Sequence, residues 1–390
     1  MNKISNFKNR FRILKGGKVS LVVSAMLLSS TVFVNSANAA PVCNQDANPL
    51  TCERTTQKAI SDGSDYTIET NGSIVLEYLP RGINISNAQN GQTITNNGLI
   101  SVNNNGFSNT LGIVISGNNG GTVTLNNTGK IESLQKGIFN FLAYSILVNG
   151  DPLLNINNSG TLRGNIHGST INLKNTGIVE LPVSGITIMK TFENESSGKL
   201  IIGLKTDGQL GAGTEYSRVF TDSAIFKNNS TIGVNVLDSS TNVELLAGSK
   251  LTNVLKASQS LTIDGKLNIT DNSALLDFEY ETTASNGEDS WGGNGEDGSI
   301  HLNVVKAKDG GGGDKTILSE TKAGNGNQNS QNAAVALQGV YDNSPDIASA
   351  FNKLPTDSSI AKAVESTTPL ATTSSVGAGS QIANGISTIV

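Results

Sequence analysis

A short phrase recurs through the middle of this sequence, and it limits the folds that the chain can adopt. In each copy an alternating apolar and polar run leads into a corner of Asn and Gly, and a second aliphatic run follows. Alternation with a period of two places one face of a β-strand in a core, and Asn and Gly tolerate the left-handed backbone of a tight corner. The corner residues are Asn97 and Gly98, Asn127 and Gly129, Asn158 and Gly160, Asn175 and Gly177, and Gly198 in a looser fifth copy.

The spacing of the corner glycines favours a stack of repeats. Gly98, Gly129, Gly160, Gly177 and Gly198 follow one another at intervals of 31, 31, 17 and 21 residues. Repeats of roughly 20 to 50 residues are typical of solenoids, in which a strand–corner–strand unit buries its apolar face only against neighbouring copies. The sequence therefore predicts an all-β fold, a right-handed parallel β-helix over residues 40–274 that includes an N-terminal cap. An ordinary β-sandwich with Asn-rich turns is the alternative.

The number of rungs is less well determined by the sequence. An interval of 31 residues fits either one rung with an excursion or more than one rung. At about 20 residues per rung, residues 60–280 would hold ~11 rungs. After residue 200 the phrase weakens, because Asn228-Asn229-Ser230 lacks the Gly and Asp264-Gly265 replaces the Asn corner with another strong turn former.

Residues 1–39 have the parts of an export signal. The first 18 residues carry six basic and no acidic side chains, an apolar stretch follows, and Ala37-Asn38-Ala39 has the small-x-small form of a cleavage site. We expect cleavage after Ala39, since cleavage after Ala40 would place Pro41 beside the scissile bond. A membrane anchor is disfavoured because serines interrupt the apolar stretch and no later run reaches the ~18 apolar residues of a span.

Removal of the signal makes the chain more acidic. The whole chain has 27 basic and 32 acidic residues, and loss of the six basic residues of the signal leaves 21 against 32, a net charge of −11. This charge argues against nucleic acid and anionic membrane surfaces as partners. An aromatic content of only 5% suits stacked aliphatic strands better than a globular enzyme core.

The two cysteines, Cys43 and Cys52, lie close to the start of the mature chain. In an oxidising compartment they are predicted to form one local disulfide that holds the irregular start of the solenoid. A lipid anchor on Cys43 is disfavoured because Val42 stands where a small residue is needed. A zinc site would have to recruit the distant His167 and His301, which is weaker still.

Residues 275–332 predict a terminal β-hairpin, or the final rungs, followed by a flexible Gly- and Asn-rich stretch. The runs 275–281 and 300–305 alternate between apolar and polar residues. Between them, 292–297 matches the first part of a calcium nonapeptide, but Ser299 stands at its apolar position and no tandem copy follows. We therefore expect an acidic solvent loop there rather than a calcium site.

Residues 333–390 change to a helical texture. Ser344-Pro345-Asp346 combines a cap residue, a first-turn Pro and an acid, as at the start of a helix. Weaker helical runs cover 359–364 and 381–389. The apolar positions with helical spacing before the cap are Ala333, Ala334, Leu337 and Val340.

The order of these segments resembles that of the monomeric autotransporters of type V secretion, whose passenger domain reaches the surface through its own C-terminal β-barrel. The segments 333–338 and 346–355 are similar to the helical region that precedes the barrel in that family. Val390 ends the chain about where the linker helix would enter the pore. We therefore expect an autotransporter passenger domain truncated before its outer-membrane β-barrel, or a passenger-like product without its transporter.

The resemblance implies a function in binding. It implies a non-enzymatic, surface-exposed passenger, an adhesin or an autoaggregation factor, whose partner is a host-cell or matrix ligand or another copy of itself. A full-length protein would also meet periplasmic chaperones and the barrel-assembly machinery on its way to the outer membrane. The truncated chain alone would stay in the periplasm. No cofactor or metal is expected.

The alternative function is that of a β-helix polysaccharide lyase or hydrolase, or another secreted enzyme. The chain has two histidines and neither a Gly-Asp-Ser-Gly nor a Gly-x-Ser-x-Gly phrase. Its aspartates are not clustered as a glycosidase pair would require. His167 lies in the polar run Arg163–Gly168, which is predicted to be a corner. We therefore predict no catalytic residue.

Overall fold

The structure is a computed structural model, and it describes residues 44–77, 81–104, 109–117, 120–135, 143–182, 185–204, 207–208, 216–236, 242–243, 245–284 and 298–368. Several sequence predictions concern residues outside these ranges. These predictions are the export signal, its cleavage positions Ala39 and Ala40, the disulfide cysteine Cys43, the acidic loop with the partial calcium pattern, and the helical run over 381–389.

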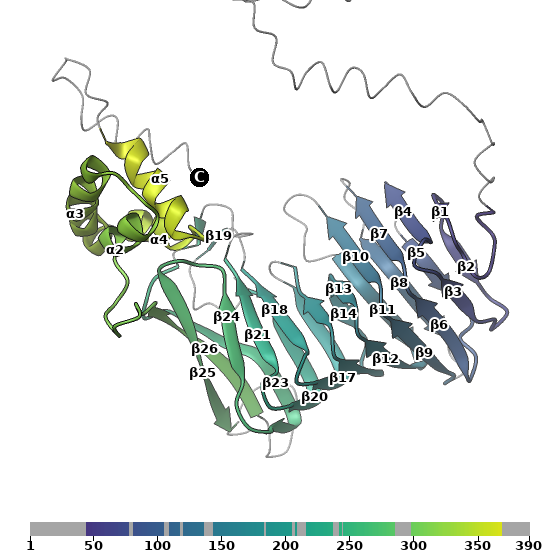
Figure 1. Ribbon diagram of the computed structural model, residues 1–390. Helices are drawn as coiled ribbons and strands as arrows, with labels where there is room; N and C mark the ends of the chain where they lie inside the picture. The colour runs from purple at the N-terminus through teal and green to yellow at the C-terminus, as the bar shows by residue number, and fades with distance from the viewer. Residues whose placement is uncertain are drawn as a thin grey trace, which may run out of the picture. The chain divides into compact units, whose positions relative to one another are not determined.

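Nine short strands stack in parallel to form the first sheet (Figure 1). In spatial order they are β1 (Glu53–Arg54), β4 (Ser73–Glu77), β7 (Leu99–Asn104), β10 (Lys130–Gln135), β13 (Thr161–Arg163), β16 (Ile178–Glu180), β18 (Lys199–Gly203), β21 (Thr231–Asn235) and β24 (Asn268–Asp271). Parallel neighbours cannot be joined by a hairpin. The chain must therefore complete a circuit between one strand of this sheet and the next.

The rest of each circuit belongs to a second sheet, which has two columns of strands. One column is β2 (Lys58–Ile60), β5 (Arg81–Ile85), β8 (Thr110–Gly117), β11 (Ala143–Gly150) and β14 (Asn165–His167), and the other is β3 (Tyr66–Ile68), β6 (Gln92–Asn96), β9 (Thr122–Asn127), β12 (Leu153–Asn158) and β15 (Ile171–Asn175). The columns merge in β17 (Ile186–Asn194), which pairs with both β14 and β15. Two longer strands, β20 (Arg218–Phe226) and β23 (Lys250–Ile263), continue the merged column.

This topology confirms the predicted fold class, an all-β parallel β-helix followed by a short helical segment. A separate pair of two-residue strands, β19 (Asp207–Gly208) and β22 (Asn242–Val243), lies outside the two sheets. The β-sandwich alternative is excluded, because all pairings among the first-sheet strands are parallel.

The strand register shows that each interval between corner glycines is one rung. Leu99 pairs with Lys130, Lys130 with Thr161, Thr161 with Ile178, and Ile178 with Lys199. These steps have the same 31, 31, 17 and 21 residues as the glycine intervals. The described residues therefore hold nine passes through the first sheet instead of the predicted eleven. The estimate was wrong because most rungs are longer than about 20 residues.

The core consists of aliphatic side chains that stand above one another in successive rungs. One such row is Ile94, Leu125, Ile156, Leu173 and Phe192, and no member is more than 1% exposed. Burial of a side chain of this size contributes ~1.5–3 kcal/mol. Because each side chain contacts copies in the rungs on either side, no single rung buries its own apolar face.

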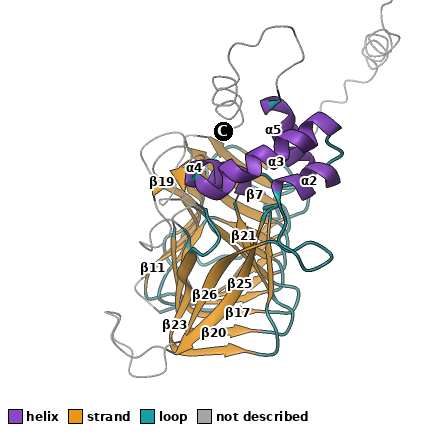
Figure 2. Cartoon of the chain, turned by 90° about the vertical axis from the view of Figure 1, so that its left-hand side faces the viewer, coloured by secondary structure: helices purple, strands orange, loops and turns teal. Residues whose placement is uncertain are grey.

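An antiparallel hairpin follows the last parallel strand. Of the two structures predicted for this segment, a terminal hairpin or further rungs, the hairpin is the one present. Strand β26 (Gly298–Lys306) pairs with β23 on one side and with β25 (Leu276–Ala284) on the other. In Figure 2 the long strands β20, β23, β26 and β25 lie beside one another. The direction of pairing therefore changes after β23, where the parallel stack ends.

Four helices follow: α2 (Ile317–Ala323), α3 (Gln328–Asn343), α4 (Pro345–Asn352) and α5 (Asp357–Thr367). The predicted cap at Ser344 and first-turn Pro345 are present at α4, although the Ser344 side chain makes no capping hydrogen bond. The predicted flexible stretch is wrong over 317–323 and 328–332, which are helical. The glycines of 310–313 form a tight turn, in which the Asp309 carboxylate accepts hydrogen bonds from the main-chain N–H groups of Gly311 and Gly313.

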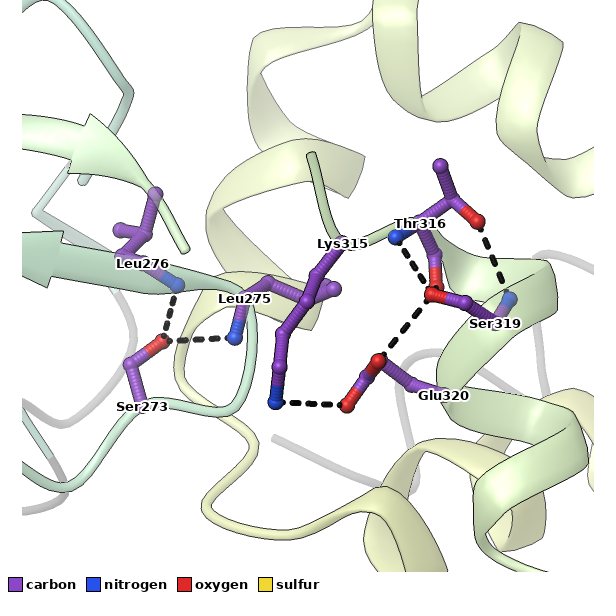
Figure 3. A network of polar contacts seen from close by, with 7 residues as sticks. All are labelled: Ser273, Leu275, Leu276, Lys315, Thr316, Ser319 and Glu320. Carbon is purple, nitrogen blue, oxygen red and sulfur yellow. Dashed lines mark hydrogen bonds and ion pairs between the residues drawn. The ribbon is translucent and has the colours of Figure 1, made fainter. Parts of the chain in front are cut away.

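The start of α2 is held by side chains that sequence reasoning missed (Figure 3). Thr316 and Ser319 form a reciprocal capping box, with Ser319 N donating to Thr316 Oγ1 and Thr316 N donating to Ser319 Oγ. Behind it, Lys315 Nζ lies 3.0 Å from a carboxylate oxygen of the buried Glu320. Burial holds the pKa of the Glu320 carboxyl above its ordinary value, and a hydrogen bond with Asp357 raises it further.

The helices pack against the end of the β-helix through a buried polar residue, Asn352. Its Nδ2 donates to the carbonyl of Leu245 at 2.7 Å, and its Oδ1 accepts from the Tyr341 hydroxyl at 2.6 Å. Ser273 Oγ donates to the main-chain carbonyl of Asn352 at 2.6 Å. The helices share a second apolar cluster with Ala274 and with the neighbouring Leu275. The segment that the sequence predicts as a linker is therefore a cap that is packed on the last rung.

Replacement of Asn352 by Ala tests this cap. We expect a loss of ~2–4 kcal/mol in the free energy of unfolding, because the Leu245 carbonyl and the Tyr341 hydroxyl lose their buried partner. Urea denaturation followed by circular dichroism measures the change. Asn343→Ala is the control, since the Asn343 side chain only donates to Gly339 at an exposed position. Equal stability of the two variants would contradict the docking of the helices on Leu245.

Candidate functional site

Five buried asparagines stand above one another where strands of the second sheet end. We call them the amide ladder: Asn96, Asn127, Asn158, Asn175 and Asn194, the last residues of β6, β9, β12, β15 and β17. None is more than 1% exposed. In the first four, Nδ2 donates to the Oδ1 of the next asparagine at 2.7–2.8 Å.

The same Nδ2 groups also tie each rung to the main chain of the following one. Asn96 donates to the Lys130 carbonyl and Asn127 to the Thr161 carbonyl, both at 3.3 Å. At the end of the ladder, Asn194 donates to Thr231 at 3.4 Å. A buried amide that lost these partners would cost ~1–3 kcal/mol. The amide ladder therefore fixes the register between rungs, and it is a structural element, not a ligand site.

Asn97 and Gly98 form the bend between β6 and β7, as predicted, but Asn97 is not the equivalent of the asparagines named in the later copies. The asparagine of the amide ladder in the first copy is Asn96, whereas Asn97 lies on the outer side, where its Oδ1 accepts from Thr128 Oγ1 at 2.9 Å. Asn127, Asn158 and Asn175 are members of the ladder. Each lies two residues before its corner glycine, and this shared offset would have identified Asn96. Asn194 was missed because it lies four residues before its glycine, Gly198.

The reason predicted for the corner glycines is also corrected. None of Gly98, Gly129, Gly160, Gly177 and Gly198 has a positive φ. Their backbones instead lie against the preceding rung. A Cβ on Gly129 would come within 2.0 Å of the Gly98 carbonyl oxygen, and one on Gly160 within 2.0 Å of the Gly129 oxygen. These glycines are needed for close approach between rungs.

Two rows of outward side chains cross the same strands, and they form the candidate functional site. We call them the outer rows: Thr93, Thr124, Asn155, Asn172 and Thr191 in the first row, and Thr95, Asn126, Asn157, Lys174 and Glu193 in the second. Strand neighbours lie ~4.8 Å apart, so each row is a regular array. All ten side chains are at least partly exposed.

The outer rows are ordered by hydrogen bonds between neighbouring rungs. Asn157 Nδ2 donates to Asn126 Oδ1 at 2.9 Å, and Asn172 Nδ2 donates to Asn155 Oδ1 at 3.0 Å. Thr191 Oγ1 donates to Asn172 Oδ1 at 2.9 Å. An amide that makes one such bond keeps donors and acceptors for a ligand. Because the side chains are already held, a ligand would lose less entropy on ordering them.

The second row changes from neutral to charged along the stack. Lys174 Nζ lies 2.6 Å from a Glu195 carboxylate oxygen and 3.7 Å from one of Glu193. The hydrogen bond to Glu195 raises the pKa of the Lys174 ammonium above its ordinary value, and Glu193 adds to the effect. The charges are paired with one another and exposed. The neutral part of the outer rows therefore consists of the whole first row and of Thr95, Asn126 and Asn157 in the second row.

The remaining candidate residues from the sequence do not converge. Cys52 is disulfide-bonded, and Cys43, the only other cysteine, lies outside the described residues. His167 belongs to β14 and His301 to β26, and β17, β20 and β23 separate these strands. Burial lowers the pKa of both imidazoles, and Nδ1 of His301 accepts the Asn253 N–H at 3.0 Å. Within the described ranges, no three His, Cys, Asp or Glu side chains are grouped to hold a metal ion.

Comparison with protein-family models, with curated proteins and with solved structures found no match to this chain. The resemblance to autotransporter passengers therefore stays a prediction from the sequence. Among the described helices, none combines the length and the apolar character that a membrane span requires.

The amide ladder can be tested against the outer rows with two neighbouring residues. Asn158→Ala leaves the Asn127 Nδ2 and the Asn175 Oδ1 without their buried amide partner, and we expect it to lower the free energy of unfolding by ~2–4 kcal/mol. Asn157→Ala removes an exposed side chain of the same type and should cost less than ~0.5 kcal/mol. Chemical denaturation of both variants measures the difference. A similar cost for the two would show that the ladder does not hold the register.

The close approach of the rungs predicts a severe effect of even the smallest side chain. Gly160→Ala places a methyl group against the Gly129 carbonyl, and we expect a loss of more than ~3 kcal/mol or failure to fold. Gly310→Ala is the control, since nothing lies within 4 Å of the added Cβ. Circular dichroism and thermal unfolding report the outcome. A fully folded Gly160→Ala protein with wild-type stability would contradict the close-approach explanation.

Proposed function

We propose that this chain is the exported passenger of a surface protein and that it acts by binding, as an adhesin or an autoaggregation factor. The export signal predicted for residues 1–39 and the resemblance of the segment order to autotransporters support an extracytoplasmic role. The stack of rungs supports binding, because solenoids offer long, regular surfaces. The proposed binding surface is the neutral part of the outer rows.

The single observation that carries this proposal is the hydrogen-bonded order of exposed amides and hydroxyls. Asn126, Asn155, Asn157 and Asn172 are bonded in pairs between rungs, at 2.9 and 3.0 Å. A surface held in this way is preorganised for a ligand that offers hydrogen-bonding groups at matching intervals. These exposed amides are not required for the stability of the stack, because the buried amide ladder already fixes the register between rungs.

A second candidate function, that of a secreted hydrolase, has one observation in its favour. A cavity of about 560 Å³ beside the hairpin is lined by the carboxylates of Asp277 and Glu279, together with Asp314. Glycosidases use two carboxyl groups with different environments, one of which is kept protonated by burial. Asp277 and Glu279 are both exposed, and Asp314 is paired with Lys308. The cavity therefore supports catalysis less well than the outer rows support binding.

The proposed function predicts that binding depends on the outer rows. The mature chain, residues 40–390, is tested for binding to cultured host cells and to matrix proteins, and for self-association by sedimentation velocity. We expect N126A with N157A to weaken the binding about 10-fold or more, because preorganised hydrogen-bonding groups are lost. R163A with E180A, which removes a partly buried ion pair on the first sheet, should leave it unchanged.

Two results would contradict the proposal. A wild-type chain that binds neither cells, matrix proteins nor itself would exclude the adhesin and autoaggregation functions. Equal loss of binding in both double variants would show that the outer rows are not the binding surface. Release of sugar from a polysaccharide by the wild-type chain would instead favour the hydrolase.

A further inference from the structure

Strand β25 lies at the edge of the second sheet and is paired on one side only. It forms nine residues of antiparallel ladder with β26 and pairs with no other strand of the described chain. An antiparallel strand directs its main-chain N–H and C=O groups alternately to its two sides. The outward groups of 277–284 have no main-chain partner within the described residues. Such an edge is a template for another strand.

The helical cap does not occupy this edge. Its apolar cluster includes Ala274 and Leu275, which precede β25 in the chain. Ser273 Oγ accepts from the N–H groups of Leu275 and Leu276 and thereby fixes the turn into the strand (Figure 3). The cap and the turn therefore lie at the start of β25. The cap does not cover the outer edge of the rest of this strand.

The two faces of β25 have different chemistry. One face carries Asp277, Glu279 and Glu281, of which the first two are exposed. The other face carries the buried Phe278 and the partly buried Tyr280, both of which contact the main core. A strand added to this edge would place its own alternate side chains beside these two sets. Basic residues would suit the first face, and apolar residues would suit the second.

The charged groups around the acidic face leave two carboxylates without an ion-pair partner in the described chain. Lys250 is paired with Glu281, and Lys308 with Asp314. Lys306 Nζ lies 3.9 Å from an Asp342 carboxylate oxygen. The carboxylates left in this way belong to Asp277 and Glu279, and they line the cavity of about 560 Å³ beside the strand. Charge complementarity therefore favours a cationic partner.

We propose that β25 is a docking edge for an extended, basic segment of a partner protein, in which Lys or Arg alternates with apolar residues. The partner adds a strand to the sheet, so that main-chain hydrogen bonds supply affinity and the two faces supply specificity. Its basic residues lie beside Asp277 and Glu279, and its apolar residues extend the row of Phe278 and Tyr280. A second copy of β25 is a poor partner, because carboxylates would face carboxylates.

This inference is independent of the function proposed for the outer rows, and a peptide titration tests it. The probe is a fluorescently labelled nine-residue peptide of alternating Lys and Val, and the readout is its anisotropy with the mature chain. We expect saturable binding that weakens about 10-fold or more in D277K with E279K, because like charges then face the peptide. E77K with D151K makes the same change in net charge at exposed positions elsewhere and should leave the affinity unchanged.

A second peptide separates strand addition from attraction between charges. The same sequence with methyl groups on alternate main-chain nitrogens keeps its charge but cannot form the ladder, and we expect it to lose binding. Circular dichroism establishes that each variant is folded, and E279Q replaces the double variant if that variant is not. No binding of the first peptide, equal binding of the methylated peptide, or an affinity unchanged by the β25 substitutions would overturn the proposal. So would self-association of the chain through β25 in sedimentation velocity.

Discussion

The fold depends on the contact that each rung makes with the next at one corner. There, an amide of the ladder donates both to the next amide and to the next main chain, while a glycine backbone lies against the preceding glycine carbonyl. The two requirements act together. A slip by one residue would carry every amide of the ladder out of the core and bring an outward side chain in, because side chains alternate along a strand. Since unpaired buried amides cost ~1–3 kcal/mol each, the ladder strongly favours one register.

A fixed corner leaves the rest of each rung free to vary. Between Thr161 and Ile178 a rung takes 17 residues, and between Thr231 and Asn268 it takes 37. The longer rungs lengthen their strands, as β11 shows in comparison with β14. Insertions are therefore tolerated mainly away from the amide ladder, and the one corner that varies, between Asn194 and Gly198, adds only two residues. This is why the corner is the part of the repeat that recurs most faithfully in the sequence.

The same logic explains where the regular region ends. After Asn194 the equivalent position in the next rung is Phe226, so the ladder of amides gives way to an aromatic side chain. Phe192 and Phe226 meet edge to face, with ring centroids 5.6 Å apart. At the following corner the glycine is absent and Asn229 has a φ of 67°. A left-handed corner thus occurs where the ladder has stopped.

Patterns local in the chain predicted much of this structure. The glycine intervals gave the register of five rungs, and alternation placed the hairpin strands. Prediction failed where the cause lay in a neighbouring rung. Asn96 and Asn97 are equally polar within their own copy, and only comparison with the other copies, or the hydrogen bond from Asn96 to the stacked Asn127, shows which of them is buried. The glycines were attributed to backbone conformation, whereas the carbonyl of the preceding rung requires them. Helix α2 was missed because its capping box, Thr316 and Ser319, follows a Gly-rich run that resembles a linker.

The outer rows were not predicted as a surface for the same reason. Thr124, Asn155 and Asn172 come from different copies of the repeat, and their spacing along the chain varies from one rung to the next. They form a row only because the corner sets each rung in register with its neighbour.

The two ends of the stack are treated differently. At the first rung the chain before β1 lies against the edge, where Leu50 bridges to Ile68 and the Asp46 carboxylate accepts from the Arg54 guanidinium at 2.8 Å. The same guanidinium donates to the carbonyls of Thr56 and Gln57. These bonds satisfy a buried cation within the chain itself. At the other end the edge strand carries exposed carboxylates at Asp277 and Glu279 instead. Charged side chains on an edge oppose pairing between like copies. An edge that carries only negative charges repels a second copy of itself and favours a partner of positive charge. The same residues, Asp277 and Glu279, therefore oppose pairing between copies and select a basic strand.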